Sequence, residues 1–285
     1  MIYVQVIVDG IIVGLMFALV AMGLSLIYGI MNIVNFAHGE FMMLAMFLSF
    51  FCWYYFAVDP IFSSIFIAVA MFGFGIFVFK ALTRHIVGQS MISQVFATFG
   101  LMIFLQAVAN FLWKANIRTV NDSITTGYFE VAGLFFSLSE VIAGAGAGIT
   151  ALALYWFLNR TETGLALQAT SEDHQAAQLM GINTDRMFSL TWGLSAGIVA
   201  IAGTLLASHF AVYPQVGVRW ILPAFVAVAI GGFGNVVGAF WGGIIVGMVQ
   251  VSGGFLTDPS YKSLFPYALF LLIVFFMPYG IMGKK

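Results

Sequence analysis

Apolar runs long enough to cross a bilayer recur along the whole chain. A helix needs about 20 apolar residues to span the hydrocarbon core. The runs are continuously apolar and do not alternate with period two, which argues against a transmembrane β-barrel. The sequence therefore predicts an all-α, polytopic transmembrane helix bundle that forms one domain over residues 1–285. The expected spans cover residues 6–28, 41–58, 61–79, 91–112, 139–158, 187–209, 220–255 and 265–282.

Charged residues are scarce throughout the chain. They make up 7% of the 285 residues, whereas hydrophobic residues make up 62%. A soluble globular domain carries roughly 25% charged residues, so the main solvent of this chain is expected to be the bilayer. The net charge of -1 gives no indication of nucleic-acid binding. The single cysteine, Cys52, can form no intrachain disulfide.

The stretch 220–255 is too long for a single crossing. Its middle holds the glycine cluster GGFGNVVGAFWGG, and two short crossings hinged at 231–235 fit it better than one strongly tilted helix. The bundle is then expected to have eight or nine crossings with broken, glycine-rich helices. Nine crossings place the N-terminus outside and the C-terminus inside. A re-entrant hairpin within 220–255 would change the number of crossings from odd to even.

Basic residues near the span ends orient the bundle, because they favour the inner side of a membrane. The larger group predicts that the loop 159–186 lies inside. That group consists of Lys80, Arg84, Arg160, Arg186, Lys284 and Lys285. The opposite side collects Lys114, Arg118, Arg219 and Lys262.

The loop 159–186, NRTETGLALQATSEDHQAAQLMGINTDR, is the longest polar segment between two spans. Ser171 offers an N-cap to a short helix in EDHQAAQLM, and Gly181 ends it. Ala176, Leu179 and Met180 would share one face of that helix. The loop is therefore interpreted either as a docking surface for a soluble partner or as a solvated connector with a chance helical pattern.

Three segments follow one another along the chain: YGIMNIVNFAHGEFMMLA, GLALQATSEDHQAAQLMGINTDR and AIGGFGNVVGAFWGG. In sequence, order and spacing they resemble the membrane permease subunits of branched-chain amino acid ABC transporters. The resemblance runs from the first span to FMPYGIMGKK, and NFAHGE and LMGIN are its most specific pieces.

This resemblance implies a translocation subunit in the inner membrane of a bacterium, with multiple crossings, no cofactor and no catalytic residue. It implies four kinds of partner molecule: a second, homologous permease, two ATPase subunits, an extracytoplasmic substrate-binding protein and the membrane lipid. It implies a branched-chain or similar small amino acid as substrate, with urea or an amide as further substrates within the same class.

The resemblance also implies that the loop 159–186 is cytoplasmic and carries the coupling helix that meets an ATPase. Many ABC importers have the pattern E-A-A-x3-G followed by I-x-L-P. This chain has Gln175, Ala176, Ala177 and Gly181, but no I-x-L-P follows. The residues expected to couple to the ATPase are Glu172, Asp173, Ala176, Ala177, Gly181 and Asn183.

Two interruptions by Gly and Asn divide the apolar pattern, one near each end of the chain. Paired interruptions are a sequence indication of a transport pathway, and non-helical backbone at membrane depth is tolerated only inside protein or beside water. The expected pathway residues are Asn32, Asn35, His38, Gly231, Gly232, Gly234 and Asn235.

For the first interruption, YGIMNIVNFAHGEF at residues 28–41, three interpretations remain open. Its Asn side chains could cap broken helix ends as a structural knot. Asn32, Asn35 and His38 could instead line the pathway and bind a zwitterionic solute. His38 and Glu40 could also be plain interfacial residues at the start of the second span.

Other functions find less support in the sequence. No Walker A pattern, catalytic triad or metal-ligand spacing occurs, and no second ligand accompanies His38. A secondary transporter or channel working alone is the alternative function, and it would be expected to carry ionisable residues within its spans. Asp9, Glu40 and Glu140 instead fall near predicted span ends. Gln106 and Asn110, four residues apart, are expected to join helices rather than bind substrate.

Overall fold

The computed structural model describes residues 2–121, 123–131 and 133–283. Lys284 and Lys285, two of the residues used above to orient the bundle, lie outside this range. Nine apolar helices lie close to the predicted spans. Their bounds are α1 (Ile2–Met31), α2 (His38–Phe56), α3 (Pro60–Ala81), α4 (Met91–Trp113), α5 (Leu138–Arg160), α8 (Thr184–Ala207), α9 (Val216–Gly231), α10 (Val236–Leu256) and α11 (Leu264–Phe276).

The predicted polytopic helix bundle is confirmed. Among the described residues, seven helices are long and apolar enough to cross a membrane, whereas α9 and α11 are apolar but shorter. The expected hinge at 231–235 is also present, because α9 ends at Gly231 and α10 begins at Val236. The number of crossings, eight or nine, stays a prediction.

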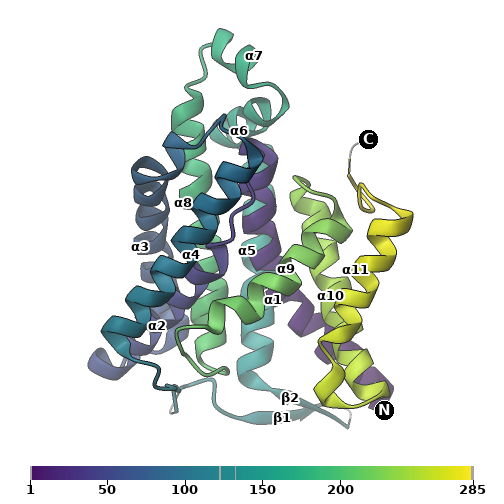
Figure 1. The fold of residues 1–285 in the computed structure, drawn as a ribbon. Coiled ribbons are helices and arrows are strands. Elements are labelled where there is room, and N and C mark those ends of the chain that lie inside the picture. The colour runs from purple at the N-terminus through teal and green to yellow at the C-terminus, as the bar shows by residue number, and fades with distance from the viewer. Residues whose placement is uncertain (1, 122, 132, 284–285) are drawn as a thin grey trace.

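Helix α1 forms the centre of the bundle, and its residues from Met16 to Ile27 are buried on every side. It packs most closely on α10, where small residues let the backbones meet. A Cβ atom built on Gly14 would lie 2.7 Å from Cα of Ile244. Figure 1 shows α1 running from the N-terminus at the lower right up through the molecule, with α9 crossing in front of it and α10 and α11 on the right.

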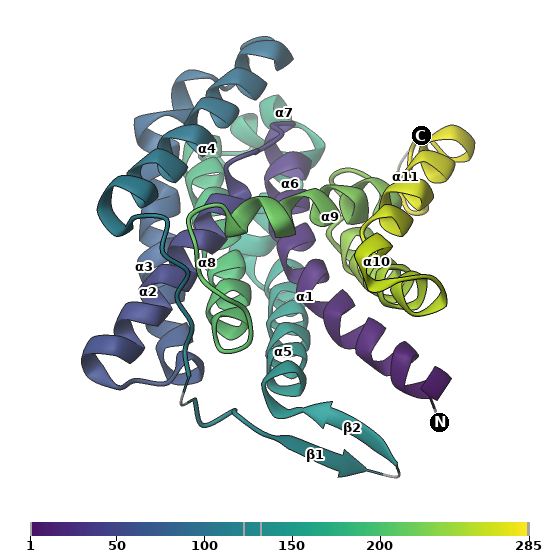
Figure 2. The same ribbon diagram turned by 60° about the horizontal axis from the view of Figure 1, so that its bottom comes forward.

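One end of the bundle, termed here the hairpin end, carries an antiparallel pair of strands. The strands β1 (Tyr128–Val131) and β2 (Leu134–Ser137) lie beside the first turns of α1 (Figure 2). The Gln5 side chain donates to the carbonyl oxygen of Phe135 at 2.6 Å and accepts from its amide at 2.9 Å. The hairpin is an addition to the predicted all-α architecture.

The opposite end, termed the loop end, carries the short helices α6 (Glu162–Glu172) and α7 (His174–Leu179). In Figure 1 these helices lie at the top and the hairpin lies at the bottom. Arg84, in the 3-10 helix η1 (Thr83–His85), pairs with Asp185 at 3.0 Å, which ties the segment after α3 to the start of α8. A second 3-10 helix, η2 (Pro259–Tyr261), joins α10 to α11.

The basic residues at the ends of α3 and α5 and after α4 lie at the ends of the bundle where the sequence places them, and the orientation in the membrane stays a prediction. Lys80 and Arg160 lie in the last turns of α3 and α5, and both helices finish at the loop end (Figure 1). At the hairpin end, Arg118 forms an isolated β-bridge with Val212 and lies over the ring of Phe51, with 5.1 Å to its centroid.

Candidate functional site

The first interruption turns the chain back into the bundle. Asn32 follows α1 with a left-handed φ of 53°, and α2 begins only at His38. The Nε2 atom of His38 lies 3.1 Å from the carbonyl oxygen of Val20, and its Nδ1 atom lies 3.4 Å from Oγ of Ser195. Val20 and Ser195 lie in the middle parts of α1 and α8, so α2 starts deep inside the bundle.

Asn35 holds this turn together. Its side chain is completely buried, and Oδ1 accepts a 3.0 Å hydrogen bond from the amide of Ala37, the N-cap residue of α2. An Asn side chain that replaces a backbone partner at a helix start is a structural feature. This hydrogen bond supports a structural role for Asn35, but it shapes the turn before α2 and does not cap the helix itself.

Glu40 lies in the first turn of α2 and is completely buried. Its Oε1 atom accepts a 2.8 Å hydrogen bond from Nε2 of Gln106 in α4. The interpretation of His38 and Glu40 as plain interfacial residues is wrong, because neither side chain reaches the surface of the chain. The expectation that Gln106 joins helices is confirmed by this hydrogen bond.

The beginning of α9 meets the beginning of α2 at this point. A Cβ atom built on Gly39 would lie 2.6 Å from the carbonyl oxygen of Gly217, and one built on Gly217 would lie 3.0 Å from Oε1 of Glu40. The positive end of the α9 dipole therefore faces a buried carboxyl group. The sequence analysis missed Gly217, and only its glycine identity could have indicated a close approach.

The second interruption separates α9 from α10. Gly232 and Gly234 have φ values of 100° and 82°, which favour glycine. Asn235 is the N-cap of α10: Oδ1 accepts from the amide of Gly238 at 2.8 Å, and Nδ2 donates to the carbonyl oxygen of Met282 at 2.9 Å. Asn235 thus joins the break to the C-terminal segment.

The C-terminal segment closes the exposed end of α9. The amide of Ile281 donates to the carbonyl oxygen of Ile230 at 2.8 Å, and the amide of Met282 donates to the carbonyl oxygen of Gly231 at 3.2 Å. The last carbonyl groups of a helix have no partner within it. Backbone far along the chain supplies these partners, and sequence analysis did not anticipate this role for the C-terminal segment.

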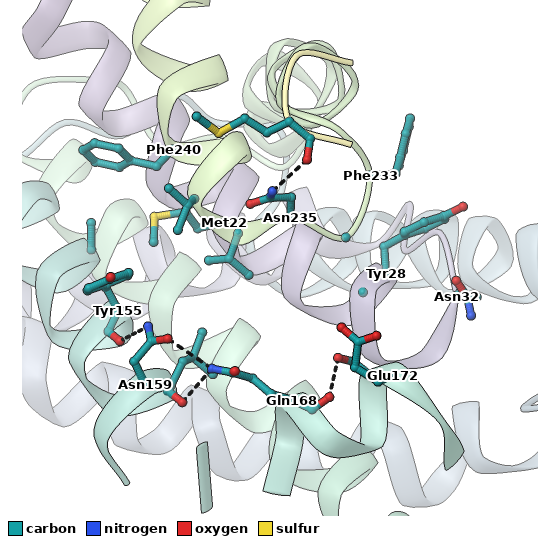
Figure 3. Close-up of a pocket in the computed structure, with 18 of the residues that line it drawn as sticks. Met22, Tyr28, Asn32, Tyr155, Asn159, Gln168, Glu172, Phe233, Asn235 and Phe240 are labelled. Atoms are coloured by element: carbon teal, nitrogen blue, oxygen red, sulfur yellow. Dashed lines mark hydrogen bonds between the residues drawn. The ribbon is translucent and has the colours of Figure 1, made fainter. Parts of the chain in front are cut away.

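The two interruptions meet at the loop end. A Cβ atom built on Gly29 would lie 2.7 Å from the carbonyl oxygen of Gly234. Beside this contact lies a groove of about 560 Å³, bordered by the end of α1, by α5, by α6 and by the corner between α9 and α10 (Figure 3). Of the predicted pathway residues, Asn32, Gly234 and Asn235 line this groove. Asn35 and His38 lie in the buried cluster at the start of α2, and Gly231 and Gly232 hold the break together.

Asp173, and not Ser171, caps the short helix in the polar loop. Ser171 lies within α6, whereas the Asp173 carboxylate accepts from the amides of Gln175 and Ala176 at 2.8 and 3.0 Å. Those hydrogen bonds lower the pKa of Asp173 below its ordinary value. The prediction of a short helix is confirmed, but its first residue is His174 because Asp173 offers the better-placed acceptor.

The far end of α7 presents apolar side chains to the surroundings. Leu179 is 88% exposed and Met180 is 83% exposed. Ala176 is also exposed, whereas Ala177 is buried beneath it. Gly181 ends the helix with a φ of 86°, as the sequence predicts, and Asn183 caps α8 by accepting from the amide of Arg186 at 3.0 Å.

The remaining predicted coupling residue, Glu172, ends α6 and lines the groove. Of the six residues predicted to couple to an ATPase, Ala177 is buried and the other five are exposed. Their role in coupling stays a prediction. Within the described residues, no group of three or more His, Cys, Asp or Glu side chains could hold a metal ion.

Comparison with known proteins assigns the family. Residues 6–274 match the family described as branched-chain amino acid transport system / permease component. The chain belongs to this family. Like its relatives, it is a multi-pass membrane protein with permease architecture.

Two curated relatives match it over nearly their whole length. The high-affinity branched-chain amino acid transport system permease protein BraD of Pseudomonas aeruginosa is 27% identical over 99% of this chain and 96% of its own. LivH of Escherichia coli, with the same description, is 28% identical over 99% of this chain and 96% of its own. The fructose import permease protein FrcC of Rhizobium meliloti is 31% identical, but over 58% of this chain and 50% of its own. No solved structure matches the chain significantly.

Proposed function

We propose that this protein is the transmembrane permease subunit of an ATP-driven ABC importer for branched-chain or similar small amino acids. The observation that carries the proposal is the match to branched-chain amino acid permeases over 99% of the chain. The protein itself hydrolyses no ATP. Its partners are a second, homologous permease, two ATPase subunits and an extracytoplasmic substrate-binding protein.

The loop end faces the cytoplasm in this proposal, and the protein lies in the inner membrane of a bacterium. Support comes from the basic residues Lys80, Arg84, Arg160 and Arg186 near the ends of α3, α5 and α8 at the loop end. The hairpin end then faces the binding protein. This orientation places α6 and α7 where an ATPase can reach them.

The exposed end of α7 is the proposed contact with the ATPase. Leu179 and Met180 offer apolar side chains, and neighbouring Ala176 and Gly181 leave room for a close approach. Apolar anchors surrounded by small or polar residues are typical of protein–protein contacts. The Asp173 and Asn183 caps would hold α7 in position and transmit its movement to α8.

The broken segments organise the pathway in this proposal. The starts of α2 and α9 meet inside the bundle, where Asn35, His38 and Glu40 are buried. Polar groups at such depth usually face a cavity or a partner helix. We assign Asn235 to helix capping and Asn35 to the turn that precedes α2, and pathway lining by Asn32 and His38 stays a prediction. Gly231, Gly232 and Gly234 give the second break its shape.

One observation favours the alternative of a transporter that works alone. Glu40 is an ionisable group buried inside the bundle, and secondary transporters couple ions through such groups. The two functions are separated by an uptake assay in cells that lack the neighbouring ATPase genes. Loss of uptake supports the importer, and persistent uptake that depends on a proton or sodium gradient supports the alternative.

The substrate is tested in the same assay by competition. Excess unlabelled leucine, isoleucine or valine is expected to abolish the uptake of labelled leucine. Fructose is the relevant comparison because FrcC matches part of this chain, and urea and acetamide test the other substrates of the class. Displacement by fructose, urea or acetamide, but not by isoleucine, would contradict the amino acid assignment.

A further inference from the structure

Glu40 is a buried acid with only one of its two oxygens in a hydrogen bond. The side chain is completely buried, and Oε1 accepts from Nε2 of Gln106 at 2.8 Å. Among the described residues, Oε2 has no hydrogen-bond partner, and no basic side chain forms an ion pair with this carboxyl group. Burial of an unpartnered carboxyl oxygen is costly, and most buried polar side-chain atoms in proteins have a partner.

The link between α2 and α4 does not explain why this residue is an acid. A glutamine would accept the same hydrogen bond from Gln106 through its amide oxygen, and it would bury no ionisable group. Ionisable side chains inside a membrane bundle usually mark the path of an ion or a substrate. The carboxyl group of Glu40 therefore fits a cationic group that reaches this position during transport.

Apolar side chains border the buried carboxyl group. On α9, Gly217, Ile221 and Phe225 are spaced four residues apart and share one face. A Cβ atom built on Gly39 would lie 2.9 Å from Cβ of Ile221, and the rings of Phe36 and Phe225 pack 5.2 Å apart. One carboxyl group beside an apolar helix face matches a molecule with one ammonium group and a hydrocarbon side chain.

The ends of α9 allow this helix to move away from α2. The two helix starts meet through glycine backbone. Irregular chain flanks α9 on both sides, at 208–215 and at 232–235, and hinges usually lie in such segments. Val212, four residues before α9, pairs with Arg118 at the hairpin end through backbone hydrogen bonds of 2.8 and 3.0 Å. Movement of this segment together with the start of α9 would open Glu40 towards the hairpin end.

We propose that Glu40 receives the ammonium group of the transported amino acid, while the substrate side chain lies against Ile221 and Phe225 of α9. This inference rests on the proposed function. The carboxylate and the ammonium group compensate each other's charge inside the bundle, where an unpaired charge is most unfavourable. A sugar or urea carries no cation for the carboxylate, so Glu40 makes the path selective for amines.

The test measures leucine transported per ATP hydrolysed by proteoliposomes that contain the complete importer, with saturating leucine-loaded binding protein outside. Glu40→Gln keeps the hydrogen bond from Gln106 but removes the charge. It should lower the ratio at least about tenfold, because a charge-assisted contact is lost, whereas thermal unfolding and stimulation of ATP hydrolysis by the binding protein should stay unchanged. Ser49→Ala is the matched control, since it removes another completely buried, unpartnered oxygen from α2, and it should transport normally.

Two further comparisons separate substrate binding from other roles of the carboxyl group. Glu40→Asp keeps the charge on a shorter side chain, whereas Glu40→Gln keeps the shape. The proposal predicts more leucine per ATP in Glu40→Asp than in Glu40→Gln, and a purely structural role predicts the reverse order. A protonophore tests proton coupling through Glu40, and it should leave ATP-driven uptake by the wild type unchanged.

A measurement on the unchanged protein covers the case in which the Glu40 variants do not assemble. Dicyclohexylcarbodiimide, an apolar reagent that modifies carboxyl groups, should label Glu40 when the complex turns over ATP with empty binding protein. Leucine-loaded binding protein should reduce this labelling severalfold, as measured by peptide mass spectrometry. Absence of labelling at Glu40, or labelling that leucine does not reduce, would overturn the proposal.

Three results with the variants and the protonophore would also overturn it. They are an unchanged ratio of leucine to ATP in Glu40→Gln, an equal loss in Ser49→Ala, and a higher ratio in Glu40→Gln than in Glu40→Asp. Wild-type uptake that stops with the protonophore would assign Glu40 to proton coupling instead. Failure of the proposed function gives a different result, because the wild type would then show no ATP-dependent leucine uptake.

Discussion

Gly39 and Gly217 touch through their backbones, although 178 positions separate them in the chain. A Cβ atom built on Gly39 would lie 2.6 Å from the carbonyl oxygen of Gly217. This contact brings the first turns of α2 and α9 together inside the bundle and leaves the Glu40 carboxyl group between them. The first interruption and the start of α9 are therefore packed against each other inside the bundle.

The first prediction concerns this contact. Gly39→Ala should lower the thermal stability of the purified protein, because the added methyl group meets rigid backbone, and overpacking typically costs about 1–3 kcal/mol. Gly73→Ala is the matched control, since nothing lies within 4 Å of a Cβ atom at Gly73. Equal unfolding temperatures for the two variants in detergent would show that the helix starts are not in contact.

The second prediction distinguishes a structural role of the Asn35 side chain from a role in the transport pathway. Asn35→Leu removes the acceptor of the Ala37 amide, and a buried donor left without a partner costs about 1–3 kcal/mol. Less folded protein should therefore reach the membrane, as measured by fluorescence-detected size-exclusion chromatography. Asn121→Leu, at an exposed position, serves as the control. Normal expression with reduced uptake would instead assign Asn35 to the pathway.

The third prediction tests the contact with the ATPase. Leu179→Glu places a charge at a position that is 88% exposed, and Gly181→Phe forces a side chain into a φ of 86°, which costs about 1–2 kcal/mol. Both variants should insert normally but capture less ATPase in a pull-down and uncouple its hydrolysis from uptake. Val131→Glu, 54% exposed on the hairpin, should leave ATPase capture unchanged. Normal capture by Leu179→Glu would place the ATPase contact elsewhere.

The fourth prediction concerns the pH dependence of α7. The pKa of Asp173 is lowered by the amides of Ala176 and Gln175, so its ionised form is favoured in the folded protein. This stabilisation is complete above the ordinary aspartate pKa of about 4 and is lost as the pH falls through the lowered value. It is therefore fully present at neutral pH.

Hydrogen exchange of the α7 amides at neutral pH checks this account. Asp173→Ala should speed exchange in residues 176–180, whereas Asp173→Asn should retain most of the protection because Asn is also a good N-cap. In the wild type, protection should decline only in acid. Slow exchange in Asp173→Ala would mean that packing, rather than the cap, holds α7.

Local patterns in the sequence predicted the apolar helices and the break at 231–235, because length, apolarity and glycine determine these directly. The depth at which α2 starts could not be predicted, since it depends on the contact of His38 with Val20 and Ser195. The contact of Gly39 with Gly217 and the hydrogen bonds that Ile281 and Met282 donate to the end of α9 could not be predicted either. These partners lie far apart in the chain, and no local pattern relates them.

The hairpin is a different kind of omission. Gly133, with a φ of 78°, follows one short apolar strand and precedes another, which is a recognisable turn signal. Long apolar runs do not reveal it, because each strand is only four residues long. The placement of Asp173 rather than Ser171 at the N-cap was equally within reach of the sequence, since both residues are good caps.

The most direct test of the central claim is leucine uptake by proteoliposomes that contain this protein, its partner permease and both ATPase subunits, with the binding protein outside the vesicles and ATP enclosed. The account predicts uptake that requires enclosed ATP and vanishes when the ATPase subunits are omitted. Leucine uptake by the permeases alone, driven by an ion gradient and unaffected by ATP, would contradict it.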